Sequence, residues 1–211
     1  MKSGLTIGLQ RCSVRAAFVS LMALALPQLA CSKDPPPAQA TSRDAVQRTR
    51  CMREMGQAQP PVSAAPPEIC PADPLPGGLA LKTLPVTVRE TGVRITAELA
   101  VVHEEAERGL MYRKYRLADD RGMLFDLPRK VQTFWMHNTC IPLDMIFVDE
   151  DGFVQGIVEQ VPTLNDEPRT AGCEGRYVLE VDAGWSRRHG LKPGMHLDMG
   201  APTGVLSTTK P

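Results

Sequence analysis

The sequence predicts a mainly β fold, a small β-sandwich or barrel-like domain with two short helices. From residue 85 to residue 200 the prolines thin out, and short β-type runs appear between turn signals. Only the segments 103–111 and 185–189 have the pattern of helices. Seven or eight short strands with two small helices fit a sandwich or barrel better than an α/β fold.

The elements follow one another with clear turns between them. Residues 86–88 and 93–99 alternate apolar and polar side chains across Thr91-Gly92, which predicts a hairpin. Gly190 ends the second helix, and Lys192-Pro193-Gly194 then turns the chain. The remaining strands are expected at 122–127, 131–136, 143–148, 153–161, 177–181 and 195–199.

Length and charge exclude several classes of protein. A chain of 211 residues is too short for a large multidomain enzyme. The whole chain is neutral, but residues 85–200 contain 14 Lys and Arg against 19 Asp and Glu, a net charge of −5. Because that segment is acidic and aromatic residues make up 5% of the chain, nucleic acid is not an expected partner. We expect a monomeric domain.

The first 30 residues predict export. Lys2, Arg11 and Arg15 precede the apolar run 16–30, which is long enough for a signal peptide but short for a membrane span. The run ends at Ala30-Cys31, which resembles a bacterial lipoprotein signal in which the cysteine receives the lipid. Ser32 favours the outer membrane, so we expect an anchor at the periplasmic face of the cell envelope. Cleavage without lipidation, giving a secreted soluble form, is the alternative.

Residues 31–84 predict a disordered tether, and residues 201–211 a short flexible tail. Ten prolines lie between Ser32 and Leu84, and the few apolar residues there show no sustained period. Such a segment suits a lipoprotein that holds a folded domain, residues 85–200, away from its membrane.

Four cysteines, Cys51, Cys70, Cys140 and Cys173, lie outside the signal and the proposed anchor. Four cysteines allow three pairings, and export supplies an oxidising compartment. We favour Cys140 with Cys173 and Cys51 with Cys70, because each pair then lies within one region. The chain has no CxxC and no zinc-type spacing, so no metal site or other cofactor is predicted.

Five ordered motifs within about residues 86–199 resemble the bacterial and archaeal family called domain of unknown function 192. They are the segments 107–111 (ERGLM), 122–125 (GMLF), 134–139 (FWMHNT), 141–145 (IPLDM) and 177–185 (YVLEVDAGW). The resemblance implies a compact, mostly β domain that is often exported, and it implies no activity. This chain has His137 where many members have Lys, and Asp182 where members commonly have Asn.

The segment 134–144 (FWMHNTCIPLD) holds the densest group of chemically capable side chains. If Phe134 and Met136 face the core, Trp135 faces the other way. The sequence then predicts a site for a small polar ligand, a glycan or a peptide, in an accessory or binding domain of the envelope. The candidate contacts are Arg108, Trp135, His137, Asn138, Asp144, Glu180 and Asp182.

Structural roles compete with this interpretation. Asp144 is suited to accept hydrogen bonds from turn amides, and Arg108 to pair with a carboxylate. Glu180 and Asp182 alternate with Val181, which fits a solvated strand face.

Two other functions stay open. His137, Asp144 and Glu180 supply the acid and base groups of a hydrolase, although sequence gives no separation between them. An exported copper protein is the second alternative, because thioether and imidazole ligands suit Cu(I). Its candidate ligands are Met111, Met123, Met136, Met145, Met195, Met199, His137 and His196.

Overall fold

The computed structural model describes residues 50–75 and 77–200. The predicted signal peptide (1–30), the proposed lipid site at Cys31 and the tail 201–211 lie outside the described residues. Within the described part of the chain, no helix is long and apolar enough to cross a membrane.

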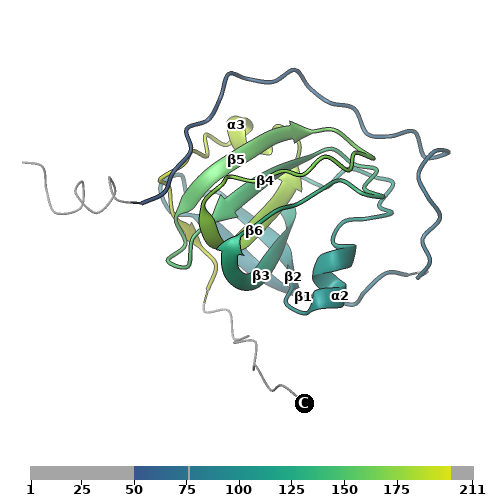
Figure 1. Ribbon diagram of the computed structural model, residues 1–211, viewed down its shortest axis with the longest axis horizontal. Helices are drawn as coiled ribbons and strands as arrows, with labels where there is room; N and C mark the ends of the chain where they lie inside the picture. The colour runs from purple at the N-terminus through teal and green to yellow at the C-terminus, as the bar shows by residue number, and fades with distance from the viewer. Residues whose placement is uncertain (1–49, 76, 201–211) are drawn as a thin grey trace, which may run out of the picture. The chain divides into compact units, whose positions relative to one another are not determined.

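The described residues form seven strands and two short helices (Figure 1). The strands are β1 (Lys82–Val88), β2 (Arg94–Ala100), β3 (Arg121–Val131), β4 (Leu143–Val148), β5 (Val154–Val161), β6 (Glu174–Asp182) and β7 (Leu197–Asp198). The helices are α2 (His103–Arg108) and α3 (Trp185–Arg188). The predicted mainly β class and the two short helices are confirmed.

The strands form one mixed, curled sheet with the order β5-β4-β6-β3-β2-β1-β7, a half-barrel. The predicted hairpin is the antiparallel pair β1–β2, and β2–β3 is a parallel pair connected through α2. Segment 194–197 also reaches the start of β5: Gly194 N–H donates to Val154 O at 2.8 Å and Leu197 N–H to Gly152 O at 2.8 Å. These hydrogen bonds link the two ends of the curled sheet.

Both faces of the sheet are buried, which explains why the central strands are apolar almost throughout. The inner face carries Ile95, Leu124, Leu179 and Trp185 among others. The outer face carries a second cluster that includes Phe125 and Met145, and α2 and the loop 132–142 cover it. Close packing also fixes Gly122, where an added Cβ would lie 2.8 Å from the carbonyl oxygen of Glu180.

The predicted strand at 131–136 is wrong. β3 continues to Val131, and the chain then leaves the sheet as a loop. The side-chain amide of Gln132 donates to the carbonyls of Pro128 (2.7 Å) and Gly175 (3.0 Å), which fastens the point of departure. Beyond β3, Phe134 forms an isolated bridge with Arg169, and Met136 N–H donates to Asn165 O at 2.8 Å. Buried and exposed side chains alternate there because the loop has one buried side.

The predicted disulfide pairing is also wrong: the bonds are Cys51–Cys173 and Cys70–Cys140. Residues 50–75 and 77–81, here called the strap, run as an arc around the sheet before entering β1 (Figure 1). Sequence proximity misled the pairing, because the strap brings Cys51 and Cys70 to distant parts of the sheet. Two covalent bonds therefore attach the strap to the domain, although its composition is that of a tether.

Non-reducing peptide mapping will detect linked peptides containing Cys51 with Cys173 and Cys70 with Cys140. On the chain-entropy model, loops of 122 and 70 residues each contribute about 4 to 5 kcal/mol to the free energy of unfolding. Replacing either pair by alanine will lower that free energy, measured by urea unfolding, and will speed protease cleavage of the strap. A Cys140–Cys173 peptide would contradict the structure.

Candidate functional site

Helix α2 places Arg108 at the mouth of a cleft. The carboxylate of Glu105 accepts the backbone N–H groups of Val101 (2.8 Å) and Val102 (3.2 Å), which fixes the first turn. Gly109 ends the helix with a φ of 47°. Arg108 donates to Asp73 of the strap at 2.5 Å and lies over the ring of Tyr112 at 5.2 Å. The hydrogen bond from Arg108 holds the pKa of Asp73 below its ordinary value.

The loop 132–142 orients Trp135. Phe134 packs edge-on against Phe125, with ring centres 4.9 Å apart, and Met136 is buried. Because its neighbours on both sides are fixed inward, Trp135 points outward and is 50% exposed. The predicted alternation of this segment is confirmed. Cys140 ties the end of the loop to Cys70 of the strap.

Tyr112 and Asn138 join the two segments. Tyr112 N–H donates to the carbonyl of Asn138 at 2.8 Å, and the Asn138 amide donates to the Tyr112 hydroxyl at 3.1 Å. Both residues have left-handed backbones, with φ of 66° for Tyr112 and 52° for Asn138. Such conformations are unfavourable for a tyrosine, and they concentrate at binding sites. The cleft is therefore held in shape by contacts between a strained tyrosine and an asparagine, a residue type that tolerates this conformation.

A cavity of about 380 Å³ lies between α2 and this loop. The Trp135 and His137 rings stack there at 5.0 Å, and His137 Nδ1 lies 2.8 Å from Asp166. Four predicted site residues thus line one cavity. Its lining comprises Pro74, Glu104, Glu107, Arg108, Met111, Tyr112, Trp135, His137 and Asn138.

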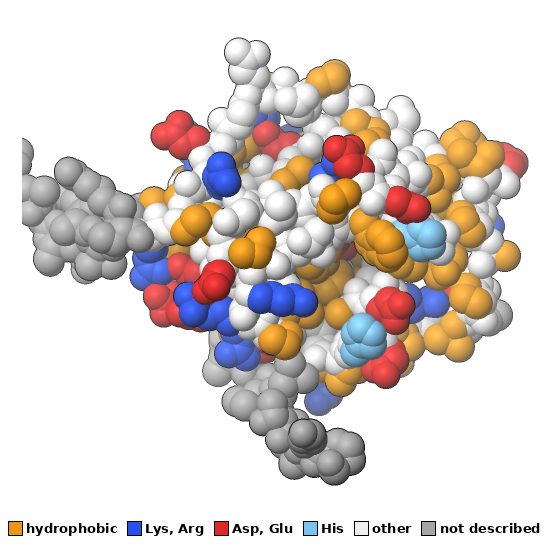
Figure 2. Space-filling model, in the orientation of Figure 1, with side chains coloured by type: hydrophobic (Ala, Val, Ile, Leu, Met, Phe, Trp, Pro, Cys, Tyr) orange, Lys and Arg blue, Asp and Glu red, His pale blue; other side chains and the backbone are white. Residues whose placement is uncertain are grey.

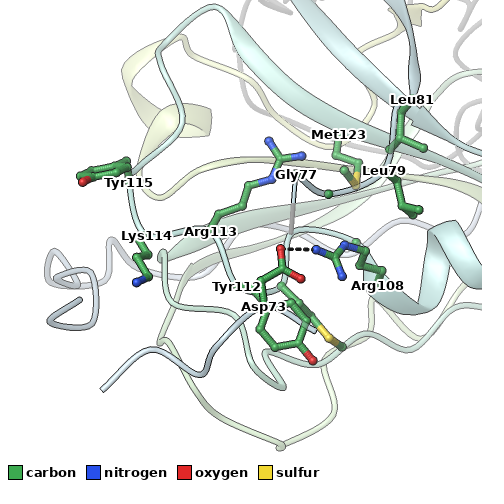
Figure 3. Close-up of a pocket in the computed structure, with 13 residues that line it drawn as sticks. Asp73, Gly77, Leu79, Leu81, Arg108, Tyr112, Arg113, Lys114, Tyr115 and Met123 are labelled. Carbon is green, nitrogen blue, oxygen red and sulfur yellow. Dashed lines mark hydrogen bonds and ion pairs between the residues drawn. The ribbon is translucent and has the colours of Figure 1, made fainter. Parts of the chain in front are cut away.

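A neighbouring cavity of about 370 Å³ shares Arg108, Met111 and Tyr112 with the first (Figure 3). Arg113 lies on its other side and donates to both carboxylate oxygens of Glu98, at 2.7 and 2.6 Å. Together the two cavities form what we call the Arg108 cleft. On the face shown in Figure 2, exposed hydrophobic side chains lie among acidic and histidine side chains, a mixture that suits ligands with both polar and apolar parts.

Glu180 lies beneath the Arg108 cleft. The strand register places Glu98, Met123 and Glu180 next to one another, and Met123 lines the second cavity. Glu180 is buried, so its expected place on a solvated strand face is wrong. Burial raises the pKa of Glu180 to about 8, and the charge of Arg113 offsets part of this rise. A neutral carboxyl therefore supports the cleft from below.

Asp144 has the structural role that its sequence position suggested. Its carboxylate accepts backbone N–H groups of Gln160, Gly184 and Ser186, each at 2.9 Å. It is fully buried, so it binds the turn before α3 to the β4–β5 pair and does not line the cleft.

Asp182 is also buried, contrary to the expected solvated face. It accepts from Arg116 at 2.7 and 2.9 Å and from Arg188 at 3.4 Å. Its role is to pair two arginines near the end of β6, outside the Arg108 cleft.

The residues proposed for a hydrolase do not converge. Asp144 pairs in register with Val181 of the inner cluster, while Glu180 pairs with Met145 of the outer cluster. Cross-strand neighbours share a face of a sheet, so the two carboxyls point to opposite faces. His137 hydrogen-bonds to Asp166 at the surface.

The methionines proposed as copper ligands are mostly core residues. Met123, Met136 and Met145 are buried in the outer cluster, and Met199 in the inner cluster. Within residues 50–75 and 77–200, no group of three or more His, Cys, Asp or Glu side chains could hold a metal ion.

The residues that sequence reasoning missed include Asp73, Tyr112 and Arg113, which line the cleft, and Glu98, which pairs with Arg113. Tyr112 directly follows the ERGLM motif, and an aromatic residue in a loop beside a motif arginine was a usable signal. Asp73 gave none, because its Pro-rich surroundings indicate a tether and not a segment packed against a domain.

Comparison with known proteins agrees with this architecture. The model of the family DUF192, described as Uncharacterized ACR, matches residues 86–199, which is more than half of the chain. The chain belongs to the DUF192 family. No curated protein sequence matches it significantly.

Two solved structures are similar to this chain in sequence and fold. The first, from Sinorhizobium meliloti 1021, is described as a "putative transcription regulator"; it is 35% identical, with a TM-score of 0.55, over 58% of this chain and 98% of that one. The second, from Novosphingobium aromaticivorans, is described as a protein of unknown function; it is 38% identical, with a TM-score of 0.53, over 61% of this chain and 91% of that one. The matched region thus covers nearly all of both relatives and about three fifths of this chain.

The buried position of Glu180 makes stability depend on pH. Below about pH 4.5 this carboxyl is protonated in both the folded and the unfolded chain. Between about pH 4.5 and about pH 8 the unfolded chain loses the proton and the folded chain keeps it. The free energy of unfolding therefore falls as pH rises, by about 1.4 kcal/mol per pH unit from this group, and levels off above the folded pKa.

Glu180→Gln will remove this dependence. The variant should gain stability over the native chain as pH rises from about 5 to about 8, as measured by urea unfolding at each pH. Glu174→Gln, an exposed acid on the same strand, is the control and should show no such trend. A constant difference between Glu180→Gln and the native chain across this range would show that Glu180 ionises normally.

Proposed function

We propose that this DUF192 chain is an exported, lipid-anchored domain of the cell envelope that binds a small polar ligand in the Arg108 cleft. The observation that carries the proposal is the meeting of Arg108, Trp135, His137 and Asn138 in one cavity, from two segments about 30 residues apart. Two disulfides are typical of proteins in an oxidising compartment outside the cytoplasm, which supports export.

The chemistry of the cleft favours a ligand that combines a flat or ring-shaped part with an anionic group. The half-exposed Trp135 ring offers a stacking surface, as in sites for sugars and peptides. Arg108 uses its Nη2 atom for Asp73, and a guanidinium fork has further N–H groups for a carboxylate or phosphate. A glycan that carries a uronic or lactyl acid group has both features, and an envelope peptide with a free carboxylate is the other source of the same chemistry.

A thermal-shift screen tests the ligand. The full chain, with its disulfides intact, is mixed with galacturonate, muramyl dipeptide, citrate and N-acetylglucosamine. A ligand at about 100 times its Kd adds about 2.7 kcal/mol, which raises Tm by several degrees. Trp135→Ala and Arg108→Gln should each abolish the shift. Ile69→Ala, an exposed residue outside the cleft, is the control and should keep it. A shift that survives in both cleft variants would contradict the proposed site.

Membrane fractionation tests the anchor. The native chain, expressed in a bacterium with lipoprotein processing, should sediment with membranes and be extracted by detergent, because a diacylated cysteine gives stable anchoring. Cys31→Ala should release the chain into the soluble fraction. Equal distribution of both forms would support cleavage without lipidation, as a secreted soluble form requires.

A further inference from the structure

A third cavity lies between the strap and β5, the strand at one end of the sheet order. It has a volume of about 460 Å³ and shares no lining residue with the Arg108 cleft. Strap residues 56–62 form one wall and β5 with the start of the next loop forms the other. Its lining comprises Gly56, Gln57, Gln59, Pro60, Val62, Ile157, Val158, Glu159, Gln160, Val161, Pro162 and Arg169.

The strap bows away from β5 because it is longer than the strand it follows. Arg53 N–H donates to Gln155 O at 2.7 Å, and Val62 N–H donates to the Gln160 side chain at 3.0 Å. Between these two contacts the strap advances nine residues while β5 advances five. Among the described residues, the Arg53 contact is the single backbone-to-backbone hydrogen bond between them. The strap, seen as the arc in Figure 1, therefore leaves most of this sheet edge unpaired, and the lining residues place the cavity between the two.

Glu159 is buried in this cavity with one oxygen unused. Its side chain is 6% exposed, and Oε2 accepts from Arg187 at 2.8 to 3.0 Å. Oε1 has no hydrogen-bond partner among the described residues. Burial raises the pKa of Glu159 above its ordinary value, although Arg187 opposes this. A buried acceptor without a donor is costly, so the cavity favours a ligand that brings one.

The cations beside Glu159 are already engaged. Arg187 also donates to the carbonyl of Gly56 at 2.7 Å, which holds the bowed part of the strap. Arg169 pairs with Glu167 at 2.6 Å. The cavity group without a partner is thus an acidic oxygen, and Gln57 and Gln59 line the same cavity. The net charge of −5 over residues 85–200 also favours a basic partner.

We propose that this cavity binds an extended peptide that adds to the edge of β5 and places a lysine side chain on the free oxygen of Glu159. Main-chain hydrogen bonds to a sheet edge give affinity in such complexes, and a side-chain pocket gives selectivity. This site goes beyond the ligand proposed for the Arg108 cleft and stands on different residues. The two proposals can therefore fail separately.

The test uses the full chain and two pools of fluorescein-labelled hexapeptides. One pool has lysine fixed at the third position and the other has norleucine there, with the remaining positions drawn from Val, Thr, Ser and Gln. A charge-assisted hydrogen bond should make the lysine pool bind about tenfold more tightly by fluorescence anisotropy. Hydrogen exchange at Ile157 and Glu159 should slow when the lysine pool is bound.

Glu159→Gln should bring the affinities of the two pools to within about twofold of each other. Glu167→Gln, which removes an exposed acid beside the same cavity, is the matched control and should preserve the preference. If Glu159→Gln does not fold, Gln59→Trp provides the second test, because an exposed glutamine is replaced by a side chain that fills the cavity. That variant should lose binding of both pools.

Three results would overturn the proposal. The first is that the lysine pool does not bind even at about 1 mM peptide, a concentration at which a specific peptide complex should form. The second is unchanged preference in Glu159→Gln or unchanged binding in Gln59→Trp. The third is binding of free cadaverine as tight as that of the lysine pool, which would show that an amine alone is recognised without addition to the sheet.

Discussion

The disulfide between Cys70 and Cys140 joins the two segments on which the rest of the Arg108 cleft depends. Cys140 ends the loop that carries Trp135, His137 and Asn138, and Cys70 lies three residues before Asp73, which pairs with Arg108. Around the bond, Ala65 and Leu164 complete a small apolar cluster. The bond therefore fixes the position of the loop relative to α2, and the hydrogen bonds between Tyr112 and Asn138 set the finer geometry.

The curled sheet supplies the platform for this arrangement. Because apolar clusters lie on both of its faces, the polar groups inside it must each find a partner or lose their charge. Asp144 has partners, because its carboxylate accepts hydrogen bonds from three backbone N–H groups. Glu180 loses its charge, because burial keeps its carboxyl protonated up to about pH 8. The two carboxyls are one position apart on neighbouring strands, and the pleat of the sheet gives them opposite environments.

The strap creates surface that the family domain alone does not have. It lies outside the residues that match DUF192, yet it contributes Asp73 to the Arg108 cleft and a complete wall to the cavity over Glu159. Segments that lack a core of their own gain order when they are cross-linked to a domain, because the bond removes conformational freedom from the unfolded chain. Both proposed binding sites therefore combine the sheet of the DUF192 domain with residues outside the segment that matches the family.

The sequence by itself determined what depends on local patterns. Period-two alternation predicted the β1–β2 hairpin, and short β-type runs between turn signals predicted β4 and β5. The FWMHNT motif predicted an outward Trp135. The turn-binding role of Asp144 also followed from its neighbours in the chain. By contrast, the segment 131–136 was predicted as a strand, but β3 ends at Val131. A local pattern does not show whether a partner strand is available.

Only the tertiary structure decided the contacts between segments far apart in the chain. The disulfide partners, the ion pair of Arg108 with Asp73 and the burial of Glu180 and Asp182 depend on how the strap and the sheet lie in space. A Pro-rich segment carries no periodic signal for its path, and a strand pattern does not reveal that both faces are covered. The free oxygen of Glu159 is of the same kind, because it depends on which donors the strap and the loops bring next to β5 in space.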